Sequence, residues 1–145
     1  MTLKGNVDTM SSFFVPLKKI PTVTHQQKRV RVVNGKPMFY EDERLEKARE
    51  LFMAHLCKHA PVTPTTGPIQ LIVKWLYQKP AKAQSGQYKT SKPDLDNAQK
   101  LLQDCMTDLK FWNDDAQIAS LVSEKFYSDV TGIYIEYRKL VETNE

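Results

Sequence analysis

The stretch Ile69-Gln-Leu-Ile-Val-Lys-Trp-Leu-Tyr77 decides the fold of this 145-residue chain. Its odd-numbered positions all carry apolar or aromatic side chains, and in an extended strand alternate side chains point to the same face. A strand with one continuous hydrophobic face has to be covered by other elements. The sequence therefore predicts a core strand over residues 69–77, with helices packed on its apolar face.

Two segments with helical periodicity flank this strand. The first covers residues 41–60, stops before Pro61, and has a stripe formed by Leu45, Ala48, Phe52, His55 and His59. The second starts at or just after Pro93, in the first turn where proline is favoured, and has a stripe formed by Leu95, Ala98, Leu102, Cys105 and Leu109. Both spacings predict amphipathic helices.

Shorter strands are predicted on either side of these helices. A strand over residues 12–15 comes first, followed by a hairpin over residues 29–40 whose Asn34-Gly35 pair suits a type I′ turn. Two more strands, over residues 118–127 and 131–138, close the chain. This order of elements indicates an α+β fold with a mixed or antiparallel sheet and two main helices packed on it.

Length and composition limit the class of protein. At 16.7 kDa, with 41% hydrophobic and 26% charged residues, residues 1–145 are expected to form a single domain. No apolar run reaches the length of a bilayer span, and the first ten residues lack the apolar core of a signal peptide. We therefore expect a cytoplasmic protein with no membrane partner, and its two cysteines cannot make a disulfide framework.

Charge is distributed unevenly along the chain. Residues 94–115 contain six aspartates and two lysines, a balance of −4, whereas the rest has 19 basic and 11 acidic residues, a balance of +8. A metal-dependent enzyme that acts on nucleic acid needs this combination, because cations hold phosphates and carboxylates hold metal ions. A moderately basic protein without such a role would show the same net charge.

Asp94 and Asp96 bracket Leu95 at the start of the second helix. Residues two apart point to opposite sides of a regular helix, so these carboxylates converge only if Asp94 precedes the first regular turn. Pro93 favours that placement. The alternative is that both aspartates only cap free N–H groups and offset the helix dipole.

A second acidic group, Asn113-Asp114-Asp115, lies between the helix and the next strand. It is either a turn or a source of oxygen ligands, which together with Asp94 and Asp96 would suit Mg²⁺. Lys100 follows Asp96 by four residues, so it forms either an ordinary ion pair on the helix or a cation beside the metal. The His55-Leu-Cys57-Lys-His59 cluster lacks further ligands for zinc.

The segments Lys92-Pro-Asp-Leu-Asp-Asn-Ala-Gln-Lys100 and Phe111-Trp-Asn-Asp-Asp-Ala-Gln-Ile118, with Asp104 between them, resemble the RusA-type Holliday junction resolvases of bacteria and their phages. The resemblance implies a homodimeric, Mg²⁺-dependent endonuclease, with Mn²⁺ as a substitute metal and no organic cofactor. It implies symmetric cleavage of a four-way DNA junction in a bacterial cell, from a host or a phage gene. The residues carried over are Asp94, Asp96 and Asp115 as catalytic metal ligands, with Asp114 as a substitute, and Lys100 as a catalytic cation.

One position departs from the family pattern. Members often have glycine before the Phe-Trp pair, where this chain has Lys110. A glycine there would end the helix in a left-handed turn, so the path of the chain into Asp114 and Asp115 is left open. If this connection is extended, only one of the two aspartates can face the site.

Residues 78–92 are predicted to form a mobile, lysine-rich loop without acidic residues. We expect Lys79, Lys82, Lys89 and Lys92 to guide the DNA backbone and Tyr88 to stack on an unpaired base. Two alternatives remain: a structure-selective nuclease acting on forks or flaps, and a non-catalytic DNA-binding module whose aspartates are only caps and turns.

Overall fold

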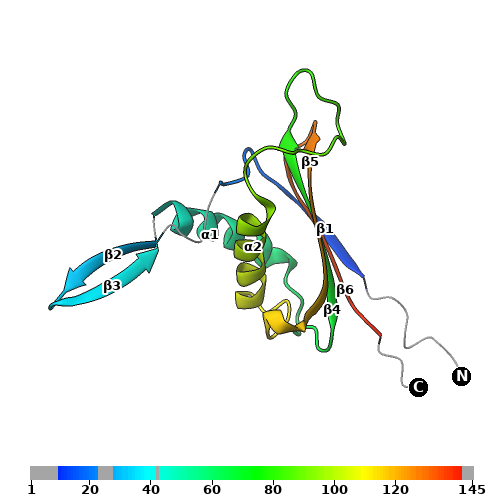
Figure 1. The fold of residues 1–145 in the computed structure, drawn as a ribbon. Coiled ribbons are helices and arrows are strands. Elements are labelled where there is room, and N and C mark those ends of the chain that lie inside the picture. Colours follow the sequence, from blue (N-terminus) through cyan, green and yellow to red (C-terminus); the bar gives the residue numbers. More distant parts are fainter. Residues whose placement is uncertain (1–9, 23–27, 42, 142–145) are drawn as a thin grey trace, which may run out of the picture.

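The computed structural model describes residues 10–22, 28–41 and 43–141. The strands are β1 (Ser11–Pro16), β2 (Lys28–Val33), β3 (Lys36–Glu41), β4 (Ile69–Gln78), β5 (Ile118–Ser128) and β6 (Gly132–Lys139). The helices are α1 (Glu43–Leu56) and α2 (Leu95–Asp108), with short 3₁₀ turns η2 (Cys57–His59) and η3 (Asp115–Gln117) (Figure 1). The predicted α+β class is confirmed.

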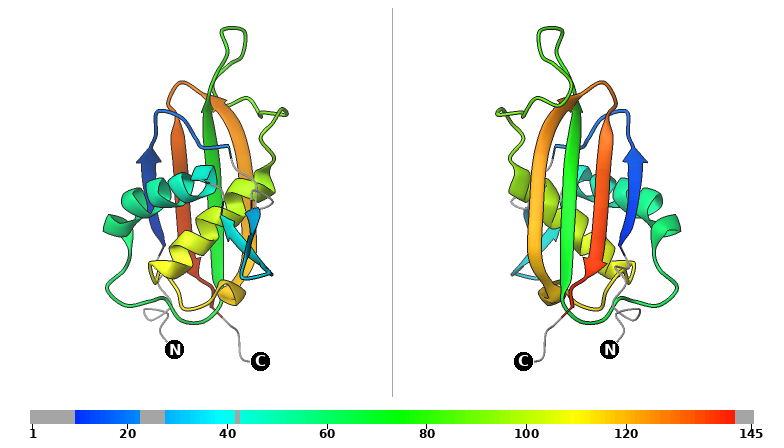
Figure 2. Two further views of the ribbon diagram at one scale, coloured as in Figure 1. Left: turned by 90° about the vertical axis from the view of Figure 1, so that its left-hand side faces the viewer. Right: turned by 90° about the vertical axis from the view of Figure 1, so that its right-hand side faces the viewer.

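β1, β6, β4 and β5 form one mixed sheet in that order. β4 pairs antiparallel with β6 and parallel with β5, and β1 pairs antiparallel with β6. Both helices lie on the same face of this sheet (Figure 2). The mixed sheet and the two covering helices agree with the prediction, and none of the described helices is long and apolar enough to cross a bilayer.

The alternation of buried and partly buried side chains over residues 69–77 shows which face of β4 lies in the hydrophobic core. Ile69, Leu71, Val73 and Trp75 are all at most 1% exposed, whereas the residues between them are only partly buried. Ile133 and Ile135 of the neighbouring strand β6 extend this apolar face. Burying each such side chain contributes about 1.5–3 kcal/mol, so the sheet face is the main source of stability.

The two helices cover this face with stripes slightly different from the predicted ones. α1 is shorter than residues 41–60 and buries Leu45, Ala48, Phe52 and Leu56. His55 and His59, which we predicted in the stripe, are only partly buried, and the His59 ring stacks on Phe13 with a centroid distance of 4.1 Å. In α2 the buried apolar residues are Ala98, Leu101, Leu102, Cys105 and Met106, whereas Leu95 and Leu109 lie at its less covered ends.

The hairpin β2–β3 forms a two-stranded sheet of its own, which projects beyond α1 (Figure 1). Its turn residues Asn34 and Gly35 have φ values of 53° and 77°, as a type I′ turn requires. The predicted hairpin is therefore confirmed.

α2 ends in the Schellman arrangement that glycine usually provides. The N–H of Phe111 donates to the carbonyl of Met106 and the N–H of Lys110 to that of Thr107, both at 3.0 Å. Lys110 has φ 65°, so a residue with a Cβ occupies the left-handed conformation. The path into Asp114 and Asp115 is therefore the one a glycine would give, at a conformational cost of about 1–2 kcal/mol.

Replacing Lys110 by glycine is expected to raise the free energy of unfolding by about 0.5–1 kcal/mol, because the strain disappears and only part of the gain is offset by the freer unfolded chain. Chemical denaturation measures this change. Lys110→Ala is the matched control, since it removes the charge and keeps the Cβ. An equal effect of the two substitutions would contradict the conformational explanation.

Candidate active site

A groove of about 470 Å³ lies between α2 and β5. Its polar lining comes mainly from one face of α2, with Asp115 at one end and Ser123 on the sheet side. The lining residues are Leu95, Asp96, Gln99, Lys100, Gln103, Asp104, Asp115, Leu121 and Ser123. Three carboxylates and one ammonium group thus face one concave surface.

The spacing along α2 explains why these groups share a face. Asp96, Lys100 and Asp104 are each four residues apart, which places them on successive turns of the same side of the helix. Asp96 and Lys100 are exposed and Asp104 is partly buried. Asp104 also lines an adjoining hollow with Arg49 of α1, Thr107, Asp108 and Asp115.

Gln99 fixes this face of α2 against the sheet. Its side chain is 4% exposed, and its amide oxygen accepts hydrogen bonds from Trp75 Nε1 at 3.2 Å and Ser123 Oγ at 2.8 Å. The same amide donates to Gln103 Oε1 at 3.2 Å. A buried amide with these partners holds α2 in one position over β4 and β5, and so fixes how far Asp96 and Lys100 lie from the sheet.

Asp115 is held by a chain of hydrogen bonds from the core. The indole N–H of the fully buried Trp112 donates to Thr107 Oγ1 at 2.8 Å. The Thr107 hydroxyl in turn donates to Asp115 Oδ1, and it also lies 2.9 Å from the carbonyl oxygen of Gln103. Because the carboxylate is the charged acceptor, it makes the stronger of these two bonds, which holds the Asp115 side chain in the groove lining.

Asp114, in contrast, is used by the backbone. Its side chain accepts a hydrogen bond from the N–H of Ala116 at 2.9 Å and caps η3. Gln117 Oε1 completes this capping box by accepting from the N–H groups of Asn113 and Asp114. The turn interpretation of the Asn-Asp-Asp sequence thus applies to Asp114, while Asp115 faces the groove.

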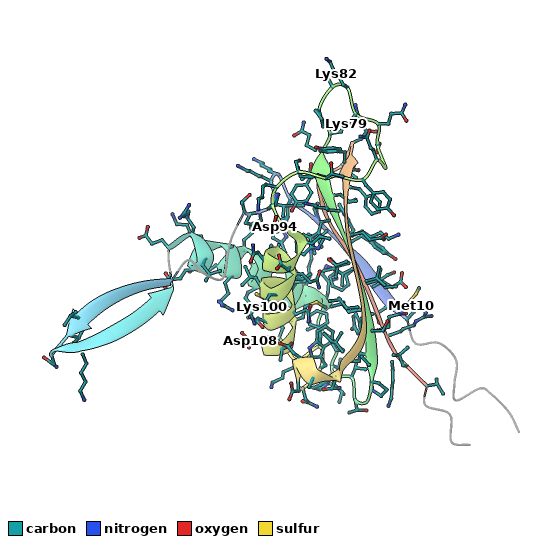
Figure 3. All side chains as sticks on the ribbon, viewed as in Figure 1. Met10, Lys79, Lys82, Asp94, Lys100 and Asp108 are labelled. Carbon is teal, nitrogen blue, oxygen red and sulfur yellow. The ribbon has the colours of Figure 1, made fainter. Side chains whose placement is uncertain are left out.

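Asp94 precedes α2 in an extended conformation with φ −70° and ψ 142°, outside the first regular turn as we expected. Its side chain makes no capping bond to the helix. It accepts a hydrogen bond from Lys92 Nζ at 2.9 Å, and this bond lowers the pKa of the Asp94 carboxyl below its ordinary 3.8. Asp94 lies at the upper end of α2, above Lys100 (Figure 3).

Of the predicted site, Asp96, Lys100 and Asp115 therefore line one groove, with Asp96 and Asp115 toward its opposite ends, and Asp94 stays outside the lining in an ion pair with Lys92. In the part of the chain that the structure describes, no three carboxylate, imidazole or thiolate groups already stand together as metal ligands. The donor chemistry fits Mg²⁺, because the oxygen donors of the groove are carboxylates, amides and one hydroxyl, and its described lining has no thiolate or imidazole. Asp94 and Asp96 lie at the start of α2, whereas Asp115 is bonded to Thr107 near the end of the helix, about 16 Å further along its axis.

Three residues that line or support the groove were missed: Gln99, Asp104 and Thr107. Asp104 had a signal in the sequence, since it follows Lys100 by four residues and lies in the quoted motif. Gln99 lies in the segment that carries the family resemblance, but its role, like that of Thr107, depends on a tryptophan that it contacts in the folded structure.

Residues 86–89 correct the prediction of a mobile loop. They are hydrogen-bonded along β5, from Gly86 N to Tyr127 O, from Tyr127 N to Gln87 O and from Lys89 N to Lys125 O, at 2.8–3.0 Å. Lys79 and Lys82 lie in the part of the loop that extends beyond the sheet (Figure 3). The ring of Tyr88 stacks on Phe126, whose side chain alternates with the groove residues of β5 and so points to the opposite face. Tyr88 is therefore directed away from the groove.

The fold and the groove are those of a small α+β protein that holds carboxylates beside a lysine-rich segment, as nucleic-acid-cleaving enzymes do. Residues 19–138 match the family model described as Endodeoxyribonuclease RusA, and the chain belongs to this family. The expected family resemblance is thus confirmed.

Two curated relatives resemble the chain over most of its length. It is 39% identical to the "Crossover junction endodeoxyribonuclease rusA" of Lactococcus phage r1t over 126 residues, which cover 86% of this chain and 94% of the relative. It is 28% identical to the "Uncharacterized protein YqaN" of Bacillus subtilis (strain 168) over 130 residues, which cover 81% and 90% of the two chains.

Replacing Lys92 by methionine is expected to raise the pKa of the Asp94 carboxyl toward 3.8, because the hydrogen bond and the charge that favour the carboxylate disappear. A carboxyl pKa that is lowered by folding stabilises the native state above about pH 4, and this stabilisation disappears as the pH falls through the lowered pKa. The Lys92 variant is therefore expected to be less stable than the wild type above about pH 4 and equally stable in strong acid. Carboxyl ¹³C NMR measures the titration. Lys100→Met is the control that leaves the pKa of Asp94 unchanged, and an equal shift in both variants would contradict the assignment.

Proposed function

We propose that this protein resolves four-way DNA junctions by paired, symmetric nicks in recombination and repair. Its membership of the RusA family supports an endodeoxyribonuclease activity, and its 39% identity to a phage crossover junction endodeoxyribonuclease supports the junction as substrate. The observation that carries the proposal is the groove beside α2, where Asp96, Asp104, Asp115 and Lys100 face one surface.

Asp94, Asp96 and Asp115 are proposed to hold Mg²⁺, with Mn²⁺ as a substitute and no organic cofactor. When bound, the metal activates a water molecule and neutralises charge on the phosphodiester. The carboxylate donor set of the groove supports this choice. Opening of its exposed ion pair with Lys92 frees the Asp94 carboxylate at little cost, because exposed pairs contribute about 0–1 kcal/mol, whereas Asp115 stays bonded to Thr107 near the other end of α2.

Lys100 is proposed to stabilise negative charge on the phosphate under attack. Its ammonium group lies on the same face of α2 as Asp96, one turn further along the helix. Positive charge placed before the reaction begins stabilises the transition state without later reorganisation. Lys92, once released from Asp94, adds a second cation at the rim.

Lys79, Lys82, Lys89 and Lys92 are proposed to bind the DNA backbone. All four belong to the segment that links the end of β4 to α2, so they lie on the approach to the groove. Tyr88 is left out of this contact surface because its ring packs on Phe126, on the other face of the sheet.

A homodimer is proposed because a four-way junction has two equivalent strands to cleave. A two-fold symmetric dimer places one groove at each strand, and paired nicks follow.

The cleavage experiment uses a synthetic four-way junction and a linear duplex of the same sequence, each with Mg²⁺ or with EDTA. We expect paired nicks on the junction alone and only with the metal. Asp96→Asn and Asp115→Asn are each expected to reduce the cleavage rate by at least about a hundredfold while junction binding in EDTA persists, because a ligand and not a fold contact is lost.

Asp114→Asn is the matched variant, because asparagine also caps a helix and is expected to keep most of the activity. Loss of cleavage in Asp114→Asn with full activity in Asp115→Asn would overturn the choice between them. Cleavage of flaps or forks in preference to the junction would favour a broader structure-selective nuclease, and junction binding without cleavage would favour a binding module.

Thr107 is proposed as a positioning residue for Asp115. Thr107→Val removes the hydroxyl between Trp112 and Asp115, so we expect a 10–100-fold lower cleavage rate and a higher Mg²⁺ concentration for half-maximal activity. The buried indole N–H loses its acceptor, at a cost of about 1–3 kcal/mol in the free energy of unfolding.

Thr107→Ser keeps the hydroxyl and serves as the rescue control. A titration of cleavage rate against Mg²⁺ separates the positioning role from a purely structural one, because only the former shifts the midpoint. The positioning role would be wrong if Thr107→Val lost stability and kept the wild-type midpoint.

A further inference from the structure

A second hollow, of about 330 Å³, lies at the end of the sheet from which the loop after β4 leaves. Figure 2 shows this loop rising above the ends of β4 and β5. The residues that line the hollow come from segments far apart in the sequence: Lys18, Lys19, Ile20, Tyr77, Gln78, Lys89, Tyr127 and Thr131. Three of them are lysines, and among these described lining residues none is acidic.

Lys89 is held in place on one wall of this hollow. Its ammonium nitrogen lies 5.4 Å from the centroid of the Tyr77 ring and 5.1 Å from that of Tyr127. It also donates a hydrogen bond to Ser91 Oγ at 2.6 Å. The cation is therefore positioned by two aromatic rings and a hydroxyl, instead of moving freely at the surface.

The described lining of the hollow carries positive charge only. Lys18 and Lys19 contribute two further charges to the lining that contains Lys89, and like charges around one concave surface repel each other. Of the two tyrosines in the lining, Tyr127 has its pKa lowered, first by the hydrogen bond with Ser91 and then by the charges of Lys89 and Lys125, whereas burial raises the pKa of Tyr77 to about 12. An anion in the hollow would remove the repulsion.

The hollow is linked directly to the groove. Lys89, Ser91, Lys92 and Asp94 follow one another along the short segment that enters α2. Lys125 Nζ fixes this segment by donating to the carbonyl oxygens of Ser91 and Pro93, both at 2.7 Å. A strand of DNA whose cleaved phosphate lies in the groove would thus carry its neighbouring phosphates toward the hollow.

We propose that this hollow binds a backbone phosphate of the DNA substrate, at a position separate from the phosphate that is cleaved. Lys18, Lys19 and Lys89 supply the positive charge, and the Tyr127 hydroxyl lies beside it. This inference rests on the proposed function, because the ligand is a phosphodiester of the junction. It adds Lys18 and Lys19, which follow β1 and lie about seventy residues from the loop, to the DNA-binding surface.

The test measures junction affinity in EDTA, by fluorescence anisotropy over a range of salt concentrations. In the double variant Lys18→Gln/Lys19→Gln we expect a Kd about 5–10-fold higher and a salt slope smaller by about 0.9, the value for one phosphate contact. Lys58→Gln, an exposed lysine of η2 that does not line the hollow, is the control with unchanged affinity. The unfolding midpoint of the double variant is expected not to fall, because a repulsive pair is removed.

A second measurement locates the contact on the DNA. Phosphates of the junction are replaced one at a time by neutral methylphosphonates. One replacement outside the cleaved position is expected to weaken wild-type binding and to have no further effect in the double variant.

The outcomes separate this inference from the proposed function. If the wild type binds and cleaves junctions and the double variant has the same salt slope and the same methylphosphonate pattern, only the phosphate site is overturned. If the wild type binds neither junction nor duplex, both proposals are overturned.

Discussion

The parallel pairing of β4 with β5 is the constraint on which the rest of the structure depends. Two parallel neighbours cannot be joined by a tight turn, so the chain has to cross the sheet, and α2 makes that crossing. The crossover brings the two acidic segments, which flank α2 in the sequence, to one side of the sheet. Gln99 then fixes the helix by its bonds to Trp75 and Ser123, one on each strand of the parallel pair. The groove exists because this buried contact sets the distance between α2 and β5.

The sequence predicted those features that depend on a local period. The alternation over residues 69–77 matches the burial of β4, and the Asn34-Gly35 pair marks the hairpin turn. It did not predict that β4 and β5 are parallel, because side chains alternate in the same way in either direction. The sequence also did not predict on which side of the sheet the Tyr88 ring lies, because this depends on the bridge between Tyr88 and Phe126, which are far apart in the sequence. The end of α1 was predicted too late, at residue 60 instead of Leu56. The prediction counted His55 and His59 as part of the buried stripe, and both side chains are only partly buried.

The two adjacent aspartates illustrate how local backbone geometry separates residues of the same type. Asp114 has the extended conformation of a cap residue, and its carboxylate is used within η3. Asp115 is the first residue of that turn, and its carboxylate meets Thr107 at the groove. The divergence depends on how α2 ends, and Lys110 ends it in the left-handed conformation despite its Cβ. Lys110, which replaces the glycine common in the family, therefore adds conformational strain but leaves the backbone path into Asp114 and Asp115 unchanged.

The groove and the hollow at the end of the sheet are lined by net charges of opposite sign. A groove lined by Asp96, Asp104 and Asp115 repels a phosphodiester, so the acidic surface alone cannot be the DNA-binding surface. The lysines at the end of the sheet carry the opposite charge and are joined to the start of α2 by residues 89–94. With the proposed DNA contacts at these lysines, the duplex would be held beside the carboxylates and kept from filling the groove. If Asp96, Asp104 and Asp115 held a divalent cation, its charge would offset this repulsion and would supply the chemistry that activates water for cleavage.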